Sequence, residues 1–536
     1  MAIFPLLSSS SSSSGNSQLA LLLLICATSC ALLGFSGGDH RSKSNLLETQ
    51  IDHCKSRPEL IINIKRSDFS DDFVFGTTTS ATQTEGFEHE GGRGPSIWDD
   101  FLQKYPDRVV GGNKQKTAID SYNRYKEDVK IIKDVGLDAY KFSISWTRIL
   151  PNGTLSGGIN QEGIDHYNSL IDEIIKQGIT PFATLFHFDP PQALQDKYGG
   201  PLSSSFVDDF KDYAEICFKE FGDRVKKWFT INEPLIIAEF GHASAMVPPL
   251  RCSDRTKCVA GNSSTEPYIV SHNLLLAHAT VVRLYKQKFY PMQRGQIGIS
   301  NVGRYYEPYD SNSPEDRLAA KRGLDLELGW YMEPLVYGDY PKIMRKLVKD
   351  RLPTFSNEEK KMIKGSFDFI GINYYTTRYA KSLPIDLSAP PAGGSFFIYI
   401  YPPGLYKILR FIKRYYKNPP IYITENGVTE ERNDSLPLNV QLKDQHRIDF
   451  IVKHLDRIHE AIENGVNVKG YFYWTMFDDF EWTEGFKPRY GLYYTDYNHN
   501  FTRIPKDSAK WFQAFLKGKA NGEIIPCINY TTLHNN

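Results

Sequence analysis

The feature that most constrains the fold is a regular alternation of short apolar runs with helical patterns between about Asp68 and Leu516. Helices are predicted at 122–135, 163–177, 206–221, 268–289 and 448–464. Eight runs are predicted to be strands: 73–77, 139–145, 181–188, 227–231, 296–300, 367–373, 421–424 and 469–474. Strands that alternate with helices form a parallel sheet, and eight such units close into a barrel. The sequence therefore predicts an α/β fold, a (β/α)8 TIM barrel in a single domain with long loop insertions.

The segments outside the barrel are assigned by composition. We expect residues 1–38 to be a signal or targeting segment, 39–65 an N-terminal extension, 66–520 the barrel and 521–536 a C-terminal tail. A stretch rich in Pro and Gly, from Leu383 to Gly404, is predicted to be a long loop over the site. Long loops in compact folds are usually functional lids or walls.

Two glutamates directly follow predicted strands. Glu233 lies just beyond the run 227–231, and Glu425 follows the run 421–424. Barrel enzymes keep their chemistry at the carboxyl ends of the strands. Two carboxylates held across one site suit the hydrolysis of a glycosidic bond, because one can protonate the leaving oxygen while the other acts as nucleophile or base.

Composition excludes one class of partner. Lys plus Arg and Asp plus Glu both number 63, so the formal net charge is zero and nothing suggests binding to nucleic acid. The 32 Tyr, 32 Phe and 7 Trp suit stacking on sugar rings, but taken alone they favour a large core. No Cys/His cluster has the spacing of a zinc site, so we expect no metal and no cofactor.

The N-terminus carries a leader with three interpretations. A serine run at 8–14 precedes an apolar stretch at 19–35, and small residues follow at 36–38. We favour a cleaved secretory signal, with a plastid transit peptide and a retained membrane anchor as alternatives, since no Lys or Arg precedes Arg41.

Five candidate N-glycosylation sequons favour the secretory route: Asn152, Asn262, Asn433, Asn500 and Asn529. We therefore expect a vacuolar, cell-wall or ER-derived location, with the plastid as alternative. No stable membrane partner is expected once the leader is removed.

The cysteines agree with an oxidising compartment. Cys252 and Cys258 bracket a short polar loop and are predicted to form a local disulfide. Cys217 lies in a helical pattern and is interpreted as a buried free thiol. Cys54 and Cys527, near the two ends of the mature chain, remain open as a second pair.

Seven phrases occur in order along the chain, each at a predicted strand end: Phe75-Gly76 with SATQTEG at 80–86, KFSISW at 141–146, HFD at 187–189, NEP at 232–234, GINYY at 371–375, ENG at 425–427, and Trp474 with FEW at 480–482. By these phrases the chain resembles glycoside hydrolase family 1, and within it the plant β-glucosidases. The matching phrases run across the whole predicted barrel.

The resemblance implies a role for each matching residue. Glu233 would be the acid/base and Glu425 the nucleophile, with carboxyl groups about 5–5.5 Å apart and retention of configuration. Tyr375 would orient Glu425. The implied substrate-binding set is completed by Gln83, His187, Asn232, Trp474, Glu481, Trp482 and Tyr490.

Some of these residues also have a structural interpretation. Without the motifs, His187 would be read as a satisfied core histidine and Trp474 as barrel core. Asn373 is left evenly divided between a turn residue and a site residue. Glu239 is interpreted as structural or solvated.

One departure from the family pattern and two positions that distinguish its subclasses narrow the predicted activity. Lys141 stands where arginine is common near the nucleophile, which keeps the charge but loses the planar fork. Glutamate rather than glutamine at Glu233 favours an oxygen-linked leaving group over a thioglucoside. Glu481 and Pro488 argue against a phosphorylated sugar, although Tyr490 matches the phosphate-binding pattern.

The sequence thus predicts a retaining β-glucosidase acting on a small-molecule β-glucoside, with a specialised plant metabolite as the apolar aglycone. The leaving group is expected to meet an aromatic and apolar wall: Phe240, Met246, Tyr305, Phe396, Phe397, Tyr399, Tyr401 and Phe486. The alternatives are a transglucosidase, a disaccharide-glycoside hydrolase, hydrolysis of a non-sugar ring and a catalytically silent binding protein. A homo-oligomer is left open.

Overall fold

The computed structural model describes residues 62–86, 90–112, 117–383 and 399–524. One compact unit spans Ile64–Gly522 and contains the barrel. A second unit is represented among the described residues by Ile62, Asn63, Glu523 and Ile524. The predicted leader, Cys54, Cys527, Asn529 and the segment 384–398 lie outside the described residues.

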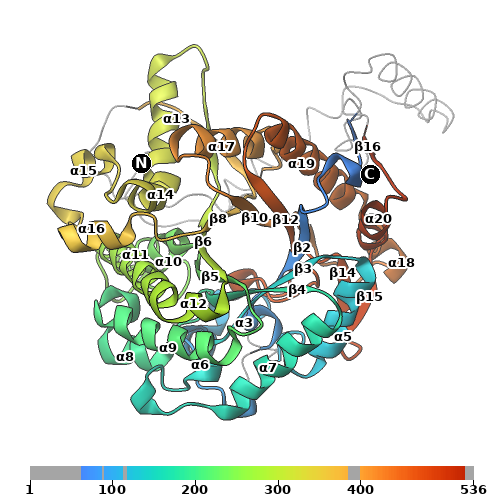
Figure 1. Cartoon of the computed structure of the whole chain (residues 1–536), viewed down its shortest axis with the longest axis horizontal. Helices are drawn as coiled ribbons and strands as arrows, with labels where there is room; N and C mark the ends of the chain where they lie inside the picture. Colours follow the sequence, from blue (N-terminus) through green and yellow to red (C-terminus); the bar gives the residue numbers. More distant parts are fainter. Residues whose placement is uncertain (1–61, 87–89, 113–116, 384–398, 525–536) are drawn as a thin grey trace, which may run out of the picture. The chain divides into compact units, whose positions relative to one another are not determined.

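Eight parallel strands close into a barrel, as predicted (Figure 1). Their order around the barrel follows the chain, and the last strand, β12, pairs with the first, β2. The strands are β2 (Val74–Thr78), β3 (Ala139–Ser143), β4 (Thr180–Phe186), β5 (Lys227–Asn232), β6 (Gln296–Val302), β8 (Phe369–Asn373), β10 (Ile421–Asn426) and β12 (Val468–Trp474).

Helices follow each strand and surround the barrel (Figure 1). The principal helix after each strand is, in order, α5 (Ser121–Val135), α7 (Gln161–Lys176), α9 (Ser205–Phe221), α11 (Glu266–Leu284), α14 (Leu328–Tyr337), α17 (Pro402–Tyr415), α19 (Gln445–Glu463) and α20 (Asp507–Leu516). Their buried residues recur at helical spacing, as in α9, where Phe206, Phe210, Tyr213 and Cys217 face the barrel side. Cys217 is therefore a buried thiol, as predicted.

One layer of side chains fills the barrel interior. It is formed by Ala139, Phe182, Phe229, Phe369, Tyr422 and Phe472, packed against Val74. Strand β6 contributes Gly298, where a Cβ would lie 2.7 Å from the Phe369 ring. All eight strands therefore meet in one packed layer, which closes the barrel below the carboxyl ends of its strands.

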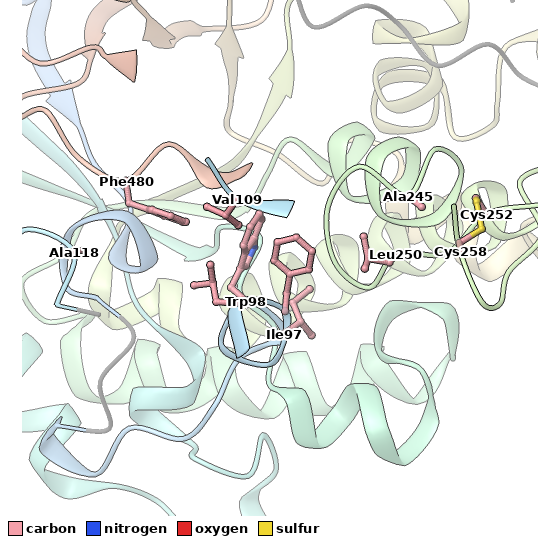
Figure 2. Close-up of a cluster of buried hydrophobic side chains, with 11 residues drawn as sticks. Ile97, Trp98, Val109, Ala118, Ala245, Leu250, Cys252, Cys258 and Phe480 are labelled. Carbon is pink, nitrogen blue, oxygen red and sulfur yellow. A yellow bond between two sulfur atoms is a disulfide. The ribbon is translucent and has the colours of Figure 1, made fainter. Parts of the chain in front are cut away.

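A second apolar cluster supports the rim beside those ends. Trp98, on α4 (Ile97–Lys104), packs at 6.4 Å from Phe480 and at 4.8 Å from Trp482, between ring centroids. Figure 2 shows this cluster, which also contains Leu250 and the disulfide between Cys252 and Cys258. That disulfide confirms the predicted pairing. Packing within this cluster holds the loops around the phrase FEW at 480–482 against one another.

Two differences from the prediction lie near the carboxyl ends of the barrel strands. A small parallel sheet, β7 (Tyr305–Pro308) with β9 (Thr377–Ala380), stands apart from the barrel strands. The predicted loop from Leu383 to Gly404 is wrong at its end, because α17 begins at Pro402; proline is favoured in the first helical turn. Among the described residues, no helix is both long and apolar enough to cross a bilayer.

Candidate active site

The next layer of the barrel, toward the carboxyl ends of the strands, is polar. Because side chains on one face of a strand are two residues apart, the positions after Ala139, Tyr422 and Phe472 are Lys141, Thr424 and Trp474. Lys141 and Thr424 are fully buried. The alternation that fills the core with aromatic rings therefore places a lysine and a threonine directly above them.

Glu233 occupies the single-residue turn between β5 and α10 (Pro234–His242). Its φ of 46° lies in the left-handed region, which costs a non-glycine residue energy. Two contacts hold this conformation: the Glu233 amide donates to the carbonyl oxygen of Ser300 at 2.9 Å, and Pro234 starts the helix at once. The carboxylate is thereby fixed at the mouth of the barrel.

Glu425 lies at the end of β10, where the pairing with β8 shifts register. This irregularity follows Ile423, and Glu425 is then opposite Asn373. The following Gly427 permits close passage of β12, since a Cβ there would lie 1.9 Å from the carbonyl oxygen of Trp474. The Glu425 side chain is buried and directed into the site with two donors beside it.

Those donors are Lys141 and Tyr375. The Tyr375 hydroxyl donates to Oε2 of Glu425 at 2.9 Å, as the resemblance implied. The Lys141 ammonium lies 3.6 Å from Oε1 of Glu425 and also donates to Oδ1 of Asn232 at 3.4 Å. The positive charge expected near the nucleophile is thus present, but through one atom rather than a planar fork.

Asn373 links the two glutamates. Its Nδ2 donates to Oε1 of Glu233 at 2.9 Å and to Oδ1 of Asn232 at 3.2 Å. Its Oδ1 accepts from the Thr424 hydroxyl at 2.6 Å, which fixes the amide orientation. The sequence left Asn373 divided between two roles, and its contacts place it in the site.

The two carboxyl groups differ in their tendency to ionise. Burial raises the pKa of Glu233 to about 8, and the negative charge of Glu425 adds to the rise. Burial also raises the pKa of Glu425, but the charge of Lys141 and hydrogen bonds from Tyr375 and Asn373 oppose it. Glu425 therefore ionises first, and the proton resides on Glu233.

A second polar group lies on the other side of the site. The Gln83 amide donates to the carbonyl oxygen of Phe480 at 2.7 Å and to Oε2 of Glu481 at 3.4 Å. The Asn232 amide and Nε2 of His187 are 3.3 Å apart. Burial lowers the pKa of His187 well below its ordinary value, so its ring is neutral. Nδ1 of this ring is buried without a protein partner among the described residues.

Aromatic faces complete this side. The His187 ring is nearly parallel to the Trp474 and Trp482 rings, with centroids 6.0 Å and 6.1 Å away. Burial raises the pKa of Glu481 to about 8, with the charge of Glu425 adding to the rise. A neutral, hydrogen-bonding and partly aromatic surface of this kind suits the hydroxyls and the flat face of a sugar.

These residues surround one cavity of about 200 Å³. The cavity is lined by Glu233 and Glu425 together with most of the predicted binding residues: His187, Tyr375, Trp474, Glu481, Trp482 and Tyr490. Gln83 and Asn232 reach the same group through their hydrogen bonds to Glu481 and His187. The structure therefore brings together every residue that the resemblance assigned to catalysis or sugar binding.

The leaving-group wall differs from its prediction. Of the eight predicted residues, Phe240 lines the cavity, Phe396 and Phe397 lie outside the described residues, and the other five are not among the lining residues. Apolar residues of α10 and the loop after it line the cavity instead: Ile236, Ile237, Val247, Pro248 and Pro249. The sequence did not single out these residues, because an apolar helix such as α10 is typical of a packed core.

The sequence analysis also missed two charged residues of the cavity lining. Arg304 and Arg378 line the cavity, and burial raises the pKa of nearby Glu239 to about 7, with the charge of Glu327 adding to the rise. Glu239, which we interpret as structural or solvated, is not among the lining residues. A signal existed in the sequence: Arg304 follows the end of β6, where barrel residues with a role are expected.

The glycosylation sequons and the possible metal ligands were also located in the structure. Asn152, Asn262, Asn433 and Asn500 are all exposed. Among the described residues, no three His, Cys, Asp or Glu side chains gather into a set that could hold a metal.

Comparison with known proteins agrees with this geometry. The family model for glycosyl hydrolase family 1 matches residues 65–521. Beta-glucosidase 24 of Oryza sativa subsp. japonica is 51% identical over 476 residues, covering 84% of this chain and 94% of that protein. The furostanol glycoside 26-O-beta-glucosidase of Hellenia speciosa is 52% identical over 474 residues, covering 84% of each chain.

Solved structures give the same answer. The crystal structure of a rice β-glucosidase matches with a TM-score of 0.80 and 43% identity, covering 84% of this chain and 99% of that one. A sequence match over most of the chain and a structural match over the same extent leave one assignment: the chain belongs to glycosyl hydrolase family 1.

Proposed function

We propose that this protein is a retaining β-glucosidase that hydrolyses O-linked β-D-glucosides of specialised plant metabolites. The observation that carries the proposal is the unequal pair of carboxyl groups in one cavity: Glu425 beside Lys141 and Tyr375, and Glu233 with its pKa raised to about 8. One group is prepared to attack and the other to donate a proton.

In the first step, Glu425 attacks the anomeric carbon while Glu233 protonates the departing glycosidic oxygen. The bond between the sugar and the aglycone breaks as a bond from Glu425 to the sugar forms. Tyr375 and Lys141 hold the attacking carboxylate in place before the reaction. Asn232, oriented by Asn373 and Lys141, is positioned to contact the 2-hydroxyl, where hydrogen bonds strengthen in the transition state.

In the second step, water replaces the aglycone. Once Glu425 is esterified its charge is gone, so the pKa of Glu233 falls and its carboxylate can take a proton from the water. Attack of that water on the anomeric carbon releases glucose with the original configuration and restores Glu425. A mutant of the matching rice enzyme has been crystallised in a covalent complex with Glc.

The substrate class is supported by the cavity and by the relatives. The sugar-binding residues are polar and aromatic, while the rest of the cavity lining includes the apolar residues of α10. The Hellenia speciosa relative is named for a furostanol glycoside. An apolar wall favours an aryl, terpenoid or steroid aglycone over a second polar sugar.

The direct test is hydrolysis of 4-nitrophenyl β-D-glucoside by the wild type, Glu425→Ala and Glu233→Gln. We expect robust turnover by the wild type and a loss of several orders of magnitude in each variant. Azide should restore part of the activity of Glu233→Gly, since this anion attacks the glucosyl-enzyme without needing a general base and gives β-D-glucosyl azide. A folded wild type inactive on every β-glucoside would refute the proposal, and faster hydrolysis of cellobiose than of aryl glucosides would refute the aglycone class.

We also propose that the leader directs the protein into the secretory pathway. The four exposed sequons and the disulfide between Cys252 and Cys258 support this location. Expression in plant cells tests it: glycosidase-sensitive mass and a mature N-terminus near residue 38 are expected, whereas an unglycosylated plastid protein would contradict it. Light scattering of the mature protein tests whether it forms a homo-oligomer.

A further inference from the structure

We propose that Arg304 and Arg378 form an anion-binding face of the cavity, and that the natural aglycone presents a carboxylate to it. The inference rests on the proposed β-glucosidase function and narrows its substrate to an aglycone with an apolar body and one acidic group.

The two arginines belong to one polar surface. Strands β7 and β9 run in parallel and pair Tyr305 with Thr377. Arg304 and Thr376 each come one residue earlier, so they are neighbours across the same small sheet. Thr376 and Arg378 are two residues apart and therefore share a face. Arg304, Thr376 and Arg378 all line the cavity that contains Glu233.

Arg304 has donor capacity that the protein does not use. Its Nη1 donates to Oε1 of Glu327 at 2.7 Å, and the Tyr306 hydroxyl donates to the same oxygen. Its Nε is buried and has no hydrogen-bond partner in the described part of the chain. A buried donor without an acceptor is energetically unfavourable. A guanidinium can bind a carboxylate through two adjacent N–H groups. Because the Arg304 side chain lines the cavity, an oxygen of the leaving group that enters there can approach its guanidinium.

The charges around this face favour an anion. Burial lowers the pKa of Arg378, and the positive charge of Arg304 lowers it further, so the two cations repel each other. Arg304 is paired with Glu327, and the Arg378 guanidinium lies 5.0 Å from the centre of the Tyr399 ring. Glu239, with a pKa of about 7, is partly protonated at neutral pH. Glu233 is also protonated before the first step. A carboxylate between the arginines relieves their repulsion.

The apolar residues of the cavity lining indicate the chemistry of the rest of the aglycone. Ile236, Ile237, Phe240, Val247, Pro248 and Pro249 offer no charged group to a substrate. An aglycone that fits this part of the cavity is therefore apolar over most of its surface and acidic at the end that meets the small sheet.

A matched substrate pair tests the inference. The 3- and 4-isomers of β-D-glucosyloxybenzoate would be compared with the corresponding benzamides, which have similar shape but no charge. The measured quantity is the ratio of kcat/KM for benzoate to that for benzamide, in the wild type, Arg304→Gln, Arg378→Gln and Arg304→Lys. Comparing ratios between enzymes cancels the different leaving abilities of the two phenols. Arg410→Gln is the control, since Arg410 is exposed on α17 and contacts the Tyr406 hydroxyl.

For at least one isomer we expect the ratio to fall about tenfold or more in Arg304→Gln and in Arg378→Gln, the usual size of a charge-assisted hydrogen bond. It should fall less in Arg304→Lys and stay unchanged in Arg410→Gln. An unchanged ratio for both isomers in Arg378→Gln and Arg304→Lys overturns the inference, even if Arg304→Gln fails to fold.

The two proposals fail in different ways. Hydrolysis of the benzamides without any dependence on the arginines overturns only the anion-binding face. If the folded protein hydrolyses no glucoside, the β-glucosidase function fails. Calorimetric binding of the benzoate glucoside to the wild type and to Arg378→Gln then decides the anion site, with equal affinities overturning it.

Discussion

The ammonium of Lys141 lies 3.6 Å from Oε1 of Glu425, and both side chains are buried. Each side chain stabilises the ionised form of the other, because an unpaired ion buried in this environment is unfavourable. Burial lowers the pKa of Lys141, and Glu425 and Glu233 oppose that change. Lys141 is therefore a positioning residue that keeps Glu425 ionised where attack requires it.

Replacement of Lys141 by Met should lower kcat/KM about a hundredfold, comparable to the loss of one preorganised electrostatic contact. Removing the cation raises the pKa of Glu425, so the acidic limb of the pH profile should move to higher pH. Lys141→Arg should restore the position of that limb. Measurement of kcat/KM from pH 4 to 9 checks both, and a Lys141→Met profile that keeps the wild-type limb would contradict this role.

Asn373 should control the basic limb of the pH profile of kcat/KM. In Asn373→Asp a carboxylate replaces the amide that donates to Glu233, so the pKa of Glu233 should rise and activity should persist to higher pH, at a lower kcat. Thr424→Val is the matched control, because it removes only the bond that orients the amide. A basic limb that does not move in Asn373→Asp would show that this contact has no effect on the acid.

The basic limb itself should belong to Glu233. Its pKa of about 8 predicts that kcat/KM falls above pH 8 as the proton needed by the leaving group is lost. With 2,4-dinitrophenyl β-D-glucoside, whose leaving group needs no acid, the first step should keep its rate in Glu233→Gln and lose that limb. If pre-steady-state release of the phenol by Glu233→Gln still declines above pH 8, another group is responsible.

The raised pKa of Glu233 predicts that the variant Glu233→Gln is more stable than the wild type at alkaline pH. A carboxyl group whose pKa is raised on folding stabilises the native state while protonated, and this contribution is lost as pH rises from 4.5 to about 8. Glu233→Gln cannot ionise and still accepts from Asn373. It should therefore unfold at a higher temperature than the wild type at pH 9 and at nearly the same temperature at pH 4. Thermal scans at both pH values test this, and equal differences at the two would contradict it.

The barrel was predictable because its strands are buried on both sides. Runs such as 421–424 are continuous, apolar and β-branched, and each of the eight predicted strands overlaps an observed one. Pro234 and Gly427 also mark where the strands β5 and β10 must end. Local sequence was sufficient here, because each element is specified by its own residues.

Contacts between distant strands were not predictable. Asn373 gains its role from Asn232 and Glu233 at the end of β5 and from Thr424 on β10. The β7–β9 sheet joins two four-residue strands more than 70 positions apart, too short for a clear period. The position of Arg304 after β6 marked that residue alone, and only the fold places it beside Thr376 and the strand that carries Arg378.

The central claim is that Glu425 forms a covalent bond with the sugar. The most direct measurement is the intact mass of the protein after incubation with 2,4-dinitrophenyl 2-deoxy-2-fluoro-β-D-glucoside, followed by peptide mapping. We expect one fluoroglucosyl group per chain on the peptide containing Glu425, and none in Glu425→Ala. Attachment to a different residue, or hydrolysis of β-glucosides with inversion and no adduct, would contradict the account.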